Sequence, residues 1–298
     1  MLFDSYVMVD WSGASTPRTG KDSIWVAILS RYQNRLRMAH LKNLPTRWEA
    51  TMWLGDRLAV LADKGDRILT GFDFPFGFPD GTAQALGLPG LPWRHIWQML
   101  CDEIEDDQNN HNTRFEVAER LNQRLTGEAF PFWGNVREEV RQYLLRRGRR
   151  PHKPADLAEQ RIVEQRVPSA QPVWKLAGVG SVGSQALTGI PKVWALRCDP
   201  RLAFRAHIWP FETGLNYDAA AQIIFAEVYP SLFPVKEISG KPKDAAQVSA
   251  LAKYFAALDQ LGTLESLFHA DPTLSKAEKA AVESQEAWIL GVSNESEK

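Results

Sequence analysis

The chain has 298 residues, of which 44% are hydrophobic and 24% charged, and its formal net charge is −1. This composition is typical of a soluble globular protein and argues against a disordered or membrane-spanning chain, while the near-neutral charge leaves only local patches to attract nucleic acid or anionic lipid. The N-terminus carries acids where a signal peptide would be positive, so we expect a cytoplasmic protein. Cys101 and Cys198 are far apart without a CxxC partner, which argues against a disulfide framework or a structural zinc site.

The N-terminal third predicts a meander followed by a helix and a fourth strand. Residues 5–11, 23–30 and 35–41 are expected strands, close enough in sequence to pair antiparallel. A capping box and leucines at helical spacing predict a helix over 46–63, and "RILTGFD" predicts a strand that ends at Asp73. Such a helix lets the fourth strand lie parallel beside the first, which is the opening order of the RNase H-like fold.

The rest of the chain completes one α/β domain spanning 1–298. Residues 80–190, where proline, glycine and helical patches alternate, are expected to form a mainly helical insertion. Strand-like runs follow at 204–211 and 222–230, and a helix is expected over about 244–261. "SKAE" predicts the cap of a last helix, and the tail "SNESEK" is expected to be disordered.

Apolar strands that carry single acids are the main functional signal. Asp10, Asp73 and Glu227 lie in or at the end of such strands, and Asp244 lies on the core-facing side of a helix at its first turn. Carboxylates buried alone are costly unless they are protonated, paired or bound to metal. If the first and fourth strands are parallel neighbours, Asp10 and Asp73 meet at their carboxyl ends, where open α/β sheets place their sites. Mg²⁺ or Mn²⁺ would offset their repulsion, and two such ions could support hydrolysis of a phosphodiester.

Each of these acids also has a purely structural interpretation. Asp10 could cap the turn through Ser12, and Asp73 could accept backbone hydrogen bonds from "FPFG". Glu227 could pair with an arginine or lysine of the insertion, and Asp244 could be an ordinary N-cap. The functional interpretation therefore depends on the four acids as a set.

Several residues are candidates for binding substrate phosphates. The basic run from 146 to 154 suits phosphate contact in an otherwise neutral protein, although a solvated surface loop is an equally good interpretation. The candidate substrate-binding residues are Arg146, Arg147, Arg149 and Arg150 in this run, Ser12 and Ser15 after Asp10, and Lys243 before Asp244. "GVGSVG", residues 178–183, matches a dinucleotide fingerprint, but Pro191 interrupts the interval before Asp199. These glycines could give amides to a phosphate or form a tight turn.

Four motifs in order, "YVMVDWSGAS", "GFDFPFGFP", "AEVYPSLF" and "KDAAQVSALA", resemble an uncharacterised family of predicted RNase H-like nucleases. The resemblance covers both flanks of the chain and leaves much of 80–190 unmatched. It implies an RNase H-like fold with acids at Asp10, Asp73, Glu227 and Asp244. It implies no proven activity, because the nuclease assignment of that family is inferred from fold. Nuclease relatives usually carry a further acid on the final helix, for which Asp244, Glu283 and Glu286 are candidates.

The sequence thus predicts a Mg²⁺- or Mn²⁺-dependent phosphodiesterase or nuclease, acting on nucleic acid or on a phosphorylated small molecule. One alternative is a nucleotide-binding phosphotransferase of the actin and sugar-kinase branch, in which "DWSGAS" would bind nucleotide phosphates. Those proteins duplicate the fold, and the sequence contains no second copy of this loop. Another alternative is a non-catalytic binding module that keeps the acids for structure.

Overall fold

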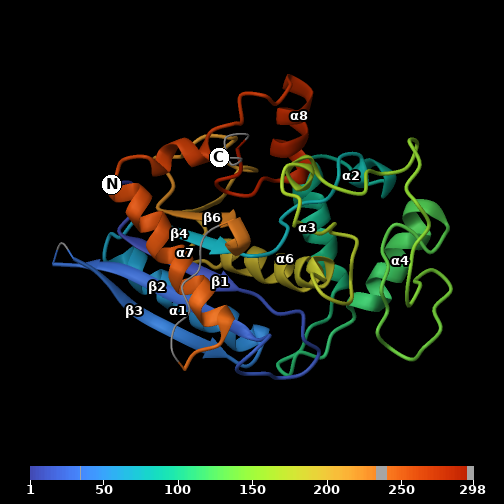
Figure 1. Ribbon diagram of the computed structural model, residues 1–298, viewed down its shortest axis with the longest axis horizontal. Helices are drawn as coiled ribbons and strands as arrows, with labels where there is room; N and C mark the ends of the chain where they lie inside the picture. Colours follow the sequence, from blue (N-terminus) through green and yellow to red (C-terminus); the bar gives the residue numbers. More distant parts are fainter. Residues whose placement is uncertain (34, 233–239, 294–298) are drawn as a thin grey trace.

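A mixed six-stranded sheet forms the centre of the computed structural model, which describes residues 1–33, 35–232 and 240–293 (Figure 1). The strands are β1 (Ser5–Asp10), β2 (Ile24–Tyr32), β3 (Arg35–Leu44), β4 (Ile68–Phe72), β5 (Ala206–Ile208) and β6 (Ile223–Glu227). They are ordered β3-β2-β1-β4-β6-β5, and β1, β4, β6 and β5 run parallel while β2 is antiparallel to both of its neighbours. The predicted meander and the parallel pairing of the fourth strand with the first are confirmed.

Helices cover both faces of this sheet. They are α1 (Arg47–Asp63), α2 (Thr82–Ala85), α3 (Pro92–Glu103), α4 (Arg114–Thr126), α5 (Ile162–Gln165), α6 (Val182–Cys198), α7 (Lys243–Gln260) and α8 (Lys276–Ala281), with short helical turns η1 (Pro230–Leu232), η2 (Leu264–Phe268) and η3 (Val282–Glu286). α7 crosses β1 and β2 on one face, and α1 and α6 pack on the other (Figure 1). No helix in the described ranges is both long enough and apolar enough to pass through a bilayer.

The alternation of side chains along β1 assigns each residue to one of these two faces. Val7 and Val9 join the core with α1 and α6, whereas Tyr6 and Met8 join the core with α7. Because successive side chains of a strand point to opposite faces, Asp10 shares the α7 face with Tyr6 and Met8.

The insertion over residues 80–190 is helical where it is regular. It contains α2, α3, α4, α5 and the first part of α6, whereas residues 127–161, all of them described, form no named helix or strand. α3 and α6 pack together beside the sheet (Figure 1), so the insertion extends the core that lies under α1.

Candidate active site

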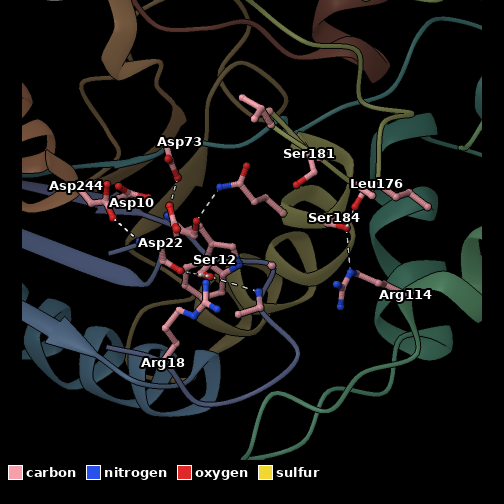
Figure 2. A pocket seen from close by; sticks show the side chains of 18 of the residues that line it. Asp10, Ser12, Arg18, Asp22, Asp73, Arg114, Leu176, Ser181, Ser184 and Asp244 are labelled. Carbon is pink, nitrogen blue, oxygen red and sulfur yellow. Dashed lines mark hydrogen bonds between the residues drawn. The ribbon is translucent and has the colours of Figure 1, made fainter. Parts of the chain in front are cut away.

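Three of the four predicted acids meet in one cleft at the carboxyl ends of β1 and β4. Val9 is paired with Phe72 in the parallel ladder, so the next residues, Asp10 and Asp73, lie side by side. Asp244 reaches the same place from the first turn of α7. All three line a cleft of about 720 Å³ (Figure 2).

Backbone amides from other segments orient two of these carboxylates. The Trp11 amide donates to Oδ1 of Asp73 at 2.7 Å, and the Asp22 amide donates to Oδ2 of Asp244 at 2.8 Å. The N-cap position of α7 is Pro242, so Asp244 does not have the capping role that the sequence left open.

The electrostatics of the cleft disfavour the charged forms of Asp10 and Asp73. Burial raises the pKa of Asp10 well above its ordinary value, and the charges of Asp73 and Asp244 raise it further. Burial raises the pKa of Asp73 to about 7, although the hydrogen bond from the Trp11 amide opposes the shift. Within the described part of the chain, no lysine, arginine or histidine forms an ion pair with Asp10, Asp73 or Asp244.

The donor set of the cleft suits a hard divalent cation. As the side chains lie, no three histidine, cysteine or acidic side chains among the described residues surround a point that could hold a metal ion. The three carboxylates nevertheless offer oxygen ligands of the kind that Mg²⁺ and Mn²⁺ prefer, and their mutual repulsion would be relieved by positive charge. Because burial raises the pKa of Asp73 to about 7, a proton and a cation would compete for this carboxylate.

The structure does not bring Glu227 to this cleft. Glu227 is paired with Phe72 in the sheet, one row before Asp10 and Asp73, and its side chain therefore points to the opposite face. Its two carboxylate oxygens accept hydrogen bonds from Arg161 at 2.6 and 2.8 Å, and one of them also accepts from the Phe76 amide at 2.9 Å. Arg161 belongs to the insertion, so Glu227 makes the structural ion pair that the sequence left open.

The acids considered for the final helix also lie outside the cleft. Glu283 accepts a hydrogen bond from the Leu215 amide at 2.8 Å. Glu286 accepts from the amides of Asp80 and Ile162 at 2.8 and 2.7 Å. Of the three candidates for the further acid, Asp244 alone lines the cleft.

The opposite wall of the cleft is built by the insertion. Residues 178–181 lead into α6, and Gly178 and Gly180 have positive φ angles. Arg114, the first residue of α4, donates from Nε to Ser184 Oγ at 2.9 Å (Figure 2). Its Nη1 donates to Ser15 Oγ at 3.0 Å. Ser12 Oγ accepts from the Ala14 amide at 3.3 Å and closes the turn after β1.

The glycine-rich segment 178–183 does not form a dinucleotide-binding unit. Among the described residues, the element directly before α6 is the short helix α5 and not a strand. Asp199 caps the C-terminal end of α6 and pairs with Arg201. A dinucleotide fingerprint requires a strand before the helix and an acid at the end of a second strand.

The predicted basic residues divide into two groups. Arg146 and Arg147 are exposed and line a hollow of about 380 Å³ that shares the segment around Gly178 with the cleft. Arg149 pairs with Glu159, and Arg150 pairs with two acids. Lys243 is exposed and does not line the cleft.

Sequence reasoning missed several residues of the cleft. Arg18, Asp22 and Arg114 come from loops or helix ends that carry no local motif. Gln247 lies three residues after Asp244, so helical spacing could have placed it on the same side of α7.

Comparisons of this chain with protein-family models, with curated proteins and with solved structures give no match. The function is therefore inferred from the cleft.

Proposed function

We propose that the protein is a Mg²⁺- or Mn²⁺-dependent phosphodiesterase of the RNase H-like class, with Asp10, Asp73 and Asp244 as the metal ligands. One observation carries the proposal: three carboxylates from three separate elements converge in one cleft, and no basic side chain within the described ranges neutralises them. Such an arrangement destabilises the chain unless a cation is bound, because desolvated like charges repel.

The topology supports the same assignment. The order β3-β2-β1-β4, with a crossover helix between β3 and β4, is the opening arrangement expected of an RNase H-like fold. Asp10 at the end of β1 and Asp73 just after β4 are the two acids that such a sheet brings together at one edge.

The surrounding backbone prepares these carboxylates as ligands. The Trp11 and Asp22 amides each bind one oxygen of an acid, which restricts the rotation of Asp73 and Asp244. Mg²⁺ or Mn²⁺ supplies charge stabilisation for in-line displacement at phosphorus. Metal ligands must be deprotonated, and burial raises the pKa of Asp73 to about 7, so metal affinity should fall as the pH drops below about 7.

The shape of the cleft is consistent with a phosphate-bearing substrate. The cleft continues into the hollow lined by Arg146 and Arg147, neither of which forms an ion pair within the described residues. Their positive charge would attract successive phosphates of a nucleic acid strand. The phosphotransferase alternative gains no support, because the described residues form one sheet and not a duplicated fold.

The test is hydrolysis of labelled single-stranded and duplex DNA and RNA in Mn²⁺. Asp10→Asn, Asp73→Asn and Asp244→Asn should each reduce the rate at least about a hundredfold, because each removes a charged ligand. Asp102→Asn, a change of an exposed acid on α3, is the matched control and should leave the rate unchanged. Equal cleavage by folded Asp10→Asn and the wild type would overturn the proposal.

A further inference from the structure

Arg114 is a buried cation whose contacts are all neutral. Its exposed fraction is 6%, and its hydrogen bonds go to Ser184 at 2.9 Å, Ser15 at 3.0 Å and Asn112 at 2.7 Å. It forms no ion pair with any described acid, and its Nη2 donates to no acceptor in the described part of the chain. Arg114 nevertheless lines the cleft, so an incoming group can reach it.

The neighbouring arginines show that this lack of a counter-ion is particular to Arg114. Arg47 pairs with Asp106, and Arg137 pairs with Glu116. Burial lowers the pKa of Arg114 to about 10, and the charges of Arg47 and Arg137 lower it further. A desolvated charge normally has a partner of opposite sign. An anion that enters the cleft would supply that partner.

The start of α6 adds further anion-binding groups beside Arg114. Ser184, on the first turn of α6, accepts from Arg114 Nε and therefore joins the guanidinium to this helix. The amides of Ser181 and Val182 donate to no acceptor in the described ranges. The N-terminus of a 17-residue helix carries partial positive charge and unpaired amides, both of which favour a phosphate.

We propose that Arg114 and the amides of Ser181 and Val182, at the start of α6, bind a phosphate group of the substrate that is distinct from the phosphate hydrolysed at the acids. That this phosphate belongs to a substrate depends on the proposed function, whereas the phosphate site itself does not. Arg114 makes no ion pair with Asp10, Asp73 or Asp244, and Figure 2 shows it across the cleft from them. The substrate would then carry at least two phosphate groups, as an oligonucleotide does.

The test measures phosphate binding without catalysis. Inorganic phosphate, added to the full chain in chelator, should raise the thermal midpoint above that in chloride of equal ionic strength. Arg114→Gln should weaken the phosphate affinity at least about tenfold, because charge-assisted hydrogen bonds are lost. The absence of a phosphate-specific shift in the wild type, or an unchanged shift in Arg114→Gln, would overturn the inference.

A second variant covers the case in which Arg114→Gln does not fold. Arg114→Lys keeps the buried charge but loses the forked donors, so it should bind phosphate at least several-fold more weakly than the wild type. Unaltered affinity in this variant would also count against the site. A nucleoside monophosphate and a short oligonucleotide, titrated in the same way, distinguish a small metabolite from a polynucleotide as the source of the phosphate.

Asp10→Asn separates this inference from the proposed function. This variant should lose hydrolysis and keep the phosphate shift, because Asp10 does not contact Arg114. Normal hydrolysis by Asp10→Asn together with an Arg114-dependent shift would refute the phosphodiesterase and leave the phosphate site. If Asp10→Asn loses hydrolysis but phosphate does not raise the thermal midpoint of the wild type, the phosphodiesterase would stand and the phosphate site would be refuted.

Discussion

Replacing Asp73 by asparagine should stabilise the metal-free protein at neutral and higher pH, although it should abolish hydrolysis. Asparagine keeps an oxygen to accept the Trp11 amide, which contacts Asp73 Oδ1 at 2.7 Å. Its amide nitrogen could also donate to the neighbouring Asp10 carboxylate. The substitution therefore removes a buried charge and preserves the hydrogen bond from the Trp11 amide.

The size of the effect follows from the pKa of Asp73, which burial raises from 3.8 to about 7. Between these values the folded chain binds more protons than the unfolded chain, so the free energy of unfolding falls as the pH rises from about 4 to about 7. Three pKa units correspond to on the order of 4 kcal/mol. At pH 8 we expect the free energy of unfolding of Asp73→Asn to be about 2 to 4 kcal/mol higher than that of the wild type. The asparagine side chain is neutral, so it does not have to be ionised in a buried site as the pH rises.

Urea denaturation in chelator at a series of pH values measures this difference. The wild-type stability should decline toward neutral pH, and Asp73→Asn should show a flatter profile. Asp102→Asn should follow the wild type to within about 0.5 kcal/mol, because its side chain is exposed. Adding Mn²⁺ should stabilise the wild type and leave Asp73→Asn nearly unchanged. A variant less stable than the wild type at pH 8 in chelator would refute the reasoning.

Three other substitutions test separate parts of the structure. Glu227→Gln should lower the free energy of unfolding by about 1 to 3 kcal/mol, because Arg161 would lose one of its two charged partners and keep Glu164. A folded variant that had lost hydrolysis would return Glu227 to the metal site. Arg146→Gln should weaken oligonucleotide binding and make the slope of log affinity against log salt concentration shallower by about one. Arg150→Gln should do neither, because the Arg150 side chain already pairs with acids. Equal effects of the two variants in titrations at several salt concentrations would contradict this division. Gly183→Ala should destabilise the chain by about 1 to 3 kcal/mol, since its Cβ would lie 2.2 Å from a carbonyl oxygen, and an unaltered denaturation midpoint would count against that packing.

Local patterns were sufficient to predict much of the fold. Short apolar runs identified β1 and β2, and alternating polar and apolar residues identified β3. Helical spacing with a capping threonine identified α1, which begins one residue after Thr46. The last strand-like runs were predicted too long: β5 covers only Ala206–Ile208, because Pro210 has no amide to extend the ladder. The path of residues 127–161 depends on tertiary contacts, and no periodic pattern could specify it.

Prediction of the candidate site depended on register. Asp10 and Asp73 could be placed together because parallel neighbours bring equivalent positions to one edge. Glu227 pairs with Phe72, the residue before Asp73, and a shift of one residue turns a strand side chain to the other face of the sheet. An acid at the end of an apolar run does not by itself show which face of the sheet its side chain will occupy. Arg114 reaches the cleft through the fold of the insertion, so only the structure could place it there.

The acid cluster joins opposite ends of the polypeptide, since the Asp22 amide donates to Asp244, which lies 222 positions later in the chain. During synthesis on a ribosome, β1 and β4 emerge long before α7, and contacts of such long range form late in folding. A growing or truncated chain that stops before α7 therefore holds only two of the three carboxylates. Under the proposed function, hydrolysis would therefore begin only after α7 has docked onto the sheet and brought Asp244 to the other two acids.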